Sequence, residues 1–109
     1  MTDLAEPLNQ ALFGFTRVIS VEVFCDESSC NDYPTYHFRA TLENDKRQRI
    51  ELLSNEITEL KLNCFHQFPY LRASDVRAQQ LDHVTLKFTE EGFDGIAFSC
   101  RKAEVRRLN

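Results

Sequence analysis

Residues 36–53, which read YHFRATLENDKRQRIELL, decide the fold class. Apolar and polar side chains alternate from Tyr36 to Leu42 and again from Gln48 to Leu52. This period of two is that of a β-strand with one buried face. Between the two runs, Asn44 and Asp45 are typical of a turn. The stretch therefore predicts an antiparallel β-hairpin.

Similar alternation surrounds this hairpin on both sides. Further strands are predicted over residues 15–25, 58–64, 84–88 and 96–100, with a last short element around Val105 and Leu108. Residues 72–82 fit either a short strand or a turn of helix. Residues 15–25 are apolar on both sides, which favours a strand buried on much of both faces. Six or seven strands in sequential, hairpin-like steps predict a mainly β fold, an antiparallel meander or a small sandwich.

One short helix is expected before the strands. Its apolar residues recur at helical spacing and are Leu4, Leu8, Ala11 and Leu12. Because Pro7 is tolerated only in a first turn, the helix is predicted from about Glu6 to Phe13, and it ends at Gly14. Only one face is apolar, so the helix should pack on the strands.

The length and composition indicate a single globular domain. The 109 residues are 42% hydrophobic and 28% charged, which argues against disorder. We expect one domain over 1–109, with a helical segment at 1–14 and a β domain at 15–109. No signal peptide or membrane span is apparent, which predicts a soluble, cytoplasmic protein without a membrane partner.

The net charge of -4 disfavours nucleic acid as a partner. Proteins that follow phosphates usually carry a basic stripe, because the neutralised phosphates supply most of the affinity. The only basic cluster lies at residues 101–107, and it is more typical of a solvated edge.

The chain has four cysteines and one alternative metal set. Cys25, Cys64 and Cys100 stand within apolar alternation, so reduced and mostly buried thiols are predicted. A structural zinc site would use Cys25, Cys30, Cys64 and His66. Cys64 and His66 are two residues apart in a strand, an awkward spacing for zinc, so no metal and no cofactor are favoured.

No catalytic motif is present, and the chain is predicted not to be an enzyme. The sequence has no G-x-S-x-G, no phosphate-binding glycine loop and no H-E-x-x-H. His37 and His83 fall on polar faces and are expected to be solvated. The acidic turn that begins at Glu90 is also expected to be solvated.

Two segments could bind another protein. An acidic loop with a neighbouring tyrosine would suit a basic partner, and an aromatic segment around a proline could anchor one. The predicted partner-binding residues are Asp26, Glu27, Asp32, Tyr33, Phe68 and Tyr70.

Residues 47–105 resemble small β-rich immunity proteins of bacterial polymorphic toxin systems. The similarity is carried by the apolar positions of Leu60-Lys61-Leu62, of residues 84–88 and of Ile96-Ala97-Phe98-Ser99-Cys100, with Val105 in a short apolar tail. The resemblance implies a bacterial, cytosolic, non-enzymatic protein that binds and blocks a partner toxin.

Other functions remain open at this point. The alternatives are a small zinc-stabilised module and a structural or ligand-binding β domain with an aromatic core. A homodimer formed by pairing of edge strands is also open, because little besides scattered Lys and Arg guards the edges.

Overall fold

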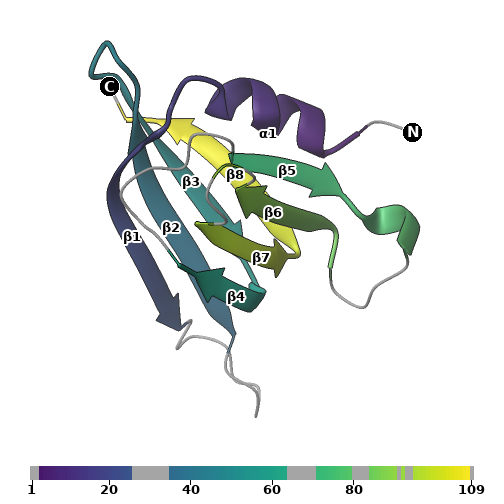
Figure 1. The fold of residues 1–109 in the computed structure, drawn as a ribbon. Helices are drawn as coiled ribbons and strands as arrows, with labels where there is room; N and C mark the ends of the chain where they lie inside the picture. Colours follow the sequence, from purple (N-terminus) through teal and green to yellow (C-terminus); the bar gives the residue numbers. More distant parts are fainter. Residues whose placement is uncertain are drawn as a thin grey trace.

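The computed structural model describes residues 3–25, 35–63, 71–79, 84–90, 92 and 95–108. These residues form one short helix and eight strands in two antiparallel sheets (Figure 1). The elements are α1 (Ala5–Leu12), β1 (Arg17–Cys25), β2 (Tyr36–Glu43), β3 (Arg49–Asn55), β4 (Thr58–Leu62), β5 (Leu71–Asp75), the 3-10 turn η1 (Arg77–Gln79), β6 (Leu86–Glu90), β7 (Ile96–Cys100) and β8 (Lys102–Arg107). The mainly β prediction is confirmed, with eight strands in place of six or seven.

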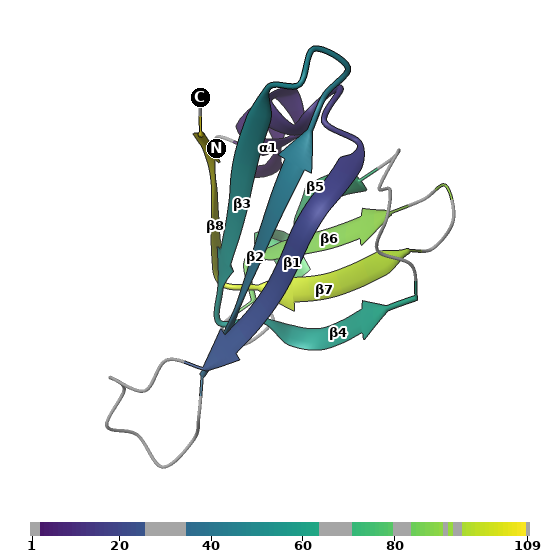
Figure 2. The same cartoon turned by 90° about the vertical axis from the view of Figure 1, so that its left-hand side faces the viewer.

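The two sheets form a sandwich. One sheet has the order β1-β2-β3-β8 and the other β4-β7-β6-β5. Strands of the first sheet run steeply across those of the second (Figure 2). The β2–β3 hairpin is present as predicted. The expected sequential steps fail where β3 leads into β4 and β7 into β8, because the chain there passes from one sheet to the other.

The two passages between the sheets belong to one continuous antiparallel ladder. Asn55 pairs with Lys102 in the first sheet, and Thr58 pairs with Ser99 in the second. From the first pair to the second, one strand advances by three residues, from Asn55 to Thr58, and the other goes back by three, from Lys102 to Ser99. The register is therefore unchanged across the corner. Thus β3 and β4 form one bent strand, and β7 and β8 form the strand beside it.

The corner itself is held by specific bonds. The Arg101 N–H donates to the Asn55 carbonyl at 3.1 Å, and the Arg101 guanidinium lies 3.3 Å from the Glu56 carboxylate. Glu56 has a left-handed φ of 54°, which turns the chain. Its N–H donates to His37 Nδ1 at 3.3 Å. His37 is half-buried at the corner, on the face of β2 opposite the buried Phe38.

A cluster of phenylalanines fills the centre of the sandwich. The centroid of the Phe98 ring in β7 lies 4.8 Å from the ring centroid of Phe38 in the opposite sheet. It lies 5.0 Å from the ring centroid of Phe88 on the neighbouring strand. Aromatic pairs at such distances add to the hydrophobic gain of burial. Around them are the other buried apolar side chains of the two sheets, Ala40, Leu42, Ile50, Leu52, Ala73, Leu86, Ile96 and Cys100.

Strand β1 differs from its prediction. None of its nine residues is buried, and among the described strands it is an edge strand that pairs only with β2. The register shifts between Val18 and Ser20, which changes the face to which the following residues point. Cys25 at the end of the strand is consequently exposed, contrary to the prediction of a buried thiol.

Helix α1 packs beside the strands, as its single apolar face predicted. It lies along β5 and also contacts β8 (Figure 1). The buried residues of the helix are Ala5, Leu8 and Leu12. Gly14, with φ of 86°, turns the chain towards β1 in a conformation that favours glycine. No helix within the described ranges is long and apolar enough to cross a membrane.

The central position of Phe98 leads to a stability prediction. We expect Phe98→Ala to lower the free energy of unfolding by about 3–5 kcal/mol, because it leaves a cavity between the sheets. Phe13→Ala removes the same atoms from an exposed side chain and should change it by less than about 0.5 kcal/mol. Urea unfolding measures both, and equal losses would contradict the assigned core.

Candidate functional site

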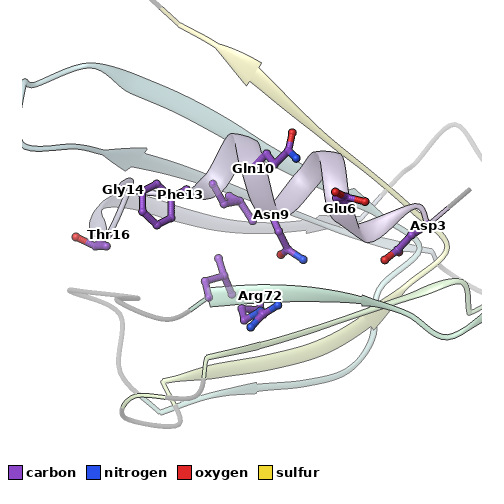
Figure 3. A pocket seen from close by; sticks show the side chains of 10 residues that line it. Asp3, Glu6, Asn9, Gln10, Phe13, Gly14, Thr16 and Arg72 are labelled. Carbon is purple, nitrogen blue, oxygen red and sulfur yellow. The ribbon is translucent and has the colours of Figure 1, made fainter.

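A groove with apolar side chains in its lining lies between α1 and β5. Its volume is about 810 Å³. It is lined by Asp3, Glu6, Asn9, Gln10, Leu12, Phe13, Gly14, Thr16, Leu71 and Arg72. The helix forms one wall, and β5, which carries Arg72, forms the other (Figure 3).

The groove exists because the side chain of Asn9 fixes the helix to the strand. Asn9 Nδ2 donates to the Ala73 carbonyl at 3.0 Å, and the Ala73 N–H donates to Asn9 Oδ1 at 2.7 Å. The side-chain amide of Asn9 thus makes the pair of hydrogen bonds that the backbone of a neighbouring β-strand would make at the edge of the sheet. Free sheet edges are prone to pairing with other chains, and this contact covers part of one.

Asp75 holds the beginning of the helix. Its Oδ2 accepts the Leu4 N–H at 3.0 Å, and its carboxylate also accepts bonds from Arg77 at 2.8 to 3.1 Å. These bonds, above all the side-chain bond from Arg77, hold the pKa of Asp75 well below its ordinary value of 3.8. A carboxylate at the end of β5 is therefore part of the scaffold that positions α1.

Phe13 is the most exposed large apolar side chain of the described residues. The helix ends at Leu12, and Phe13 leaves it in an extended conformation before Gly14. Its exposure is 86%, although the adjacent Leu12 is buried. Figure 3 places Phe13 at one end of the groove, near the beginning of β5.

The other end of the groove is acidic. Asp3 and Glu6 lie near the beginning of the helix, opposite in position to Phe13 (Figure 3). Asp3 Oδ1 accepts the Ala5 N–H at 2.8 Å, while Glu6 is exposed. The groove thus combines an apolar end with an acidic end, joined by the polar side chains of Asn9 and Gln10.

The partner-binding residues predicted from the sequence lie outside the described residues. This holds for Asp26, Glu27, Asp32, Tyr33, Phe68 and Tyr70. Of the alternative zinc set, Cys30, Cys64 and His66 lie outside as well, and the exposed Cys25 is the one member that is described. Within the described ranges, no three His, Cys, Asp or Glu side chains are grouped closely enough to hold a metal ion.

Two predictions about polar side chains can be compared with the structure. Cys100 is free and buried, as predicted, and burial raises the pKa of its thiol to about 12. Glu90 is also buried, so the expectation of a solvated acidic turn is wrong there. Its carboxylate accepts the N–H groups of Gly92 at 2.7 Å and Gly95 at 3.2 Å, which closes the turn between β6 and β7.

The sequence reasoning overlooked Asn9 and Phe13. Asn9 lies between the buried residues Leu8 and Leu12 of the helix, at the border of its apolar face. A polar residue at such a border, in a helix expected to lie on strands, is a usable signal for an edge contact. The sequence predicted Phe13 to be the last residue of the helix, whereas the helix ends at Leu12. The following Gly14 is the residue that could have indicated this earlier end.

Removal of the Asn9 contact should loosen the helix. We expect Asn9→Leu to lower the free energy of unfolding by about 1–2 kcal/mol, because it leaves two backbone groups of β5 without their partner. Amide exchange at Ala73 should become at least about tenfold faster. Gln10→Leu, one residue along on the exposed side, serves as the control. Unchanged exchange at Ala73 in Asn9→Leu would contradict this contact.

The lowered pKa of Asp75 leads to a pH prediction. A carboxylate whose pKa is lower in the folded state stabilises the fold above its unfolded pKa, and this contribution is lost as the pH falls. Thermal unfolding of the native protein and of Asp75→Asn should therefore differ most near neutral pH. The difference should shrink from about pH 5 to about pH 2. Asp45→Asn, in an exposed turn, controls for loss of one carboxylate, and a constant difference for Asp75→Asn would refute the prediction.

No protein-family model matches the sequence, and no curated protein or solved structure matches the chain.

Proposed function

We propose that the chain is a non-enzymatic protein-binding domain that holds a segment of a partner protein in the groove between α1 and β5. The observation that carries this proposal is the 86% exposure of Phe13 at the end of that groove. Large apolar side chains exposed beside a hollow are typical of interaction sites.

Phe13 is suited to anchor a partner. Coverage of an exposed phenylalanine contributes roughly 25 cal/mol for each Å² of apolar surface removed from water. Leu12 and Leu71 line the same groove, so an apolar side chain of the partner would meet three apolar residues together. A few such anchors usually provide most of the affinity of an interface.

The acidic end indicates the chemistry of the partner. Asp3 and Glu6 would attract a basic residue that lies several residues from the apolar anchor in the partner segment. This agrees with the sequence-based expectation of a basic partner. The proposal thus commits to a partner segment that combines an apolar and a basic side chain.

The sequence resemblance suggests one form of this function. An immunity-type inhibitor would cover a partner toxin in the bacterial cytoplasm and block it. The six partner-binding residues predicted from the sequence remain part of this proposal as a further contact surface.

Site-specific crosslinking tests the proposed groove. A photoreactive amino acid at position 13 should give an adduct with one partner in the native cytosol, whereas the same amino acid at Leu108 should not. Leu108 is also exposed but lies outside the groove. Mass spectrometry of the adduct identifies the partner, which can then be purified and titrated.

Titration of that partner gives the quantitative prediction. Phe13→Ser should weaken binding at least about tenfold, as expected for the loss of an aromatic anchor. Glu6→Lys should weaken binding more at low than at high salt. Leu108→Ser is the matched control and should bind as the native chain does. A partner that binds Phe13→Ser with unchanged affinity would overturn the proposal.

A further inference from the structure

The described parts of the two sheets end at four edge strands, β1 and β8 in one sheet and β4 and β5 in the other. Three of these edges are protected. Helix α1 covers part of β5 through Asn9. Four of the six residues of β8 are charged, and β4 is interrupted by a register shift between Thr58 and Lys61. Covering segments, charged side chains and irregular register all hinder an edge from pairing with another chain.

Strand β1 lacks these features over most of its length. It is the longest of the described strands, with nine residues, and it forms the outside of its sheet (Figure 2). From Ser20 to Cys25 its register with β2 is regular, and Glu22 is the one charged residue in that stretch. An edge that is long, regular and largely apolar is suited to pair with a further strand.

The inner face of this edge is apolar and open. Val21 and Val23 pair with Ala40 and Phe38 of β2, which are buried in the core. Val23 nevertheless remains 44% exposed, whereas Phe38 is 1% exposed. The apolar row of the sheet therefore reaches solvent at Val23, and a strand added beside β1 would cover it.

The outer face of the edge differs between two neighbouring positions. Glu22 and Phe24 lie on this face, as does Arg39 of β2. Arg39 Nη1 lies 3.3 Å from Glu22 Oε2, and Arg39 Nε lies 3.8 Å from Glu51 Oε2. The guanidinium carbon of Arg39 lies 5.0 Å from the centroid of the Phe24 ring. An acidic side chain on an added strand would thus face a like charge opposite Glu22, but an aromatic ring beside a cation opposite Phe24.

We propose that two copies of the chain pair through β1, antiparallel and with a two-fold axis at Val23. Val23 then faces Val23 of the second copy on the inner face, and Val21 faces Cys25. On the outer face, Glu22 of each copy faces Phe24 of the other. The two side chains of every pair lie on the same face of the sheet, as antiparallel pairing requires. The strand is therefore complementary to itself in both apolar character and charge.

Neighbouring axes fit less well. An axis at Glu22 would place the two carboxylates directly opposite each other, which is destabilising. An axis at Val21 would bring the register shift between Val18 and Ser20 of each copy into the ladder. The axis at Val23 pairs residues 21–25 of both copies and avoids both faults.

The pairing joins the two β1-β2-β3-β8 sheets into one sheet that continues through both copies. Such an interface is symmetric, because the same strand is used on each side. None of its residues lines the groove between α1 and β5. The proposal is therefore independent of the proposed protein partner, and each copy keeps its own groove.

Sedimentation equilibrium of the purified chain tests the pairing. In reducing buffer, which prevents a disulfide through Cys25, the average mass should rise from that of one chain to that of two as the concentration increases. A chain that stays monomeric at every concentration would overturn the proposal.

Two substitutions at the axis test the register. Val23→Lys and Val23→Glu should each weaken dimerisation at least about tenfold, because two like charges would face each other where the interface excludes water. An equal mixture of the two variants should dimerise again, since a lysine then faces a glutamate. Amide NMR spectra of the separate variants establish that each is folded.

Leu62→Lys is the matched control, because it adds a lysine to an exposed apolar position of an edge strand in the opposite sheet. It should dimerise as the native chain does. A Val23→Lys variant that dimerises like the native chain, or a mixture that stays monomeric, would overturn the pairing at Val23.

Discussion

The structure depends on one bent antiparallel ribbon. β3 continues into β4 and β7 continues into β8. The register is kept across the corner, from the Asn55–Lys102 pair to the Thr58–Ser99 pair, and it shifts between Thr58 and Lys61. All remaining strands are added to this ribbon as hairpins, β1 and β2 on one sheet and β5 and β6 on the other. The bonds of Arg101 to Asn55 and Glu56 hold the bend, and Phe98 fills the space that the bend encloses.

The position of the candidate site follows from this ribbon. Because the ribbon supplies one edge strand of each sheet, β8 and β4, the opposite edges are formed by β1 and β5. Helix α1 covers part of the β5 edge through the two bonds of Asn9 to Ala73. The groove lies between the helix and this strand, and Phe13, just before the turn at Gly14, lines it.

The sequence predicted the local elements better than their assembly. Alternation identified most strands and the β2–β3 hairpin, because a period of two depends only on which face of a strand is buried. It did not predict that β3 pairs with β8, since that pairing joins distant residues and leaves no local pattern. The sequence predicted β1 to be more buried than it is. Apolar residues on both faces are found in buried strands, but also in an edge strand with a bulge, such as β1. The roles of Asn9 and Glu90 follow from backbone groups of other segments, which the sequence does not display.

The bent ribbon also has a consequence for folding during synthesis. β1, β2 and β3 can pair as soon as they are made, but the other edge of β3 stays open until β8 has been translated. Pairing over such sequence distances is slow, because a long loop must close before the contacts form. A nascent chain that pauses before residue 102 therefore carries an unpaired strand, which is the stage at which it is most prone to aggregate with other copies.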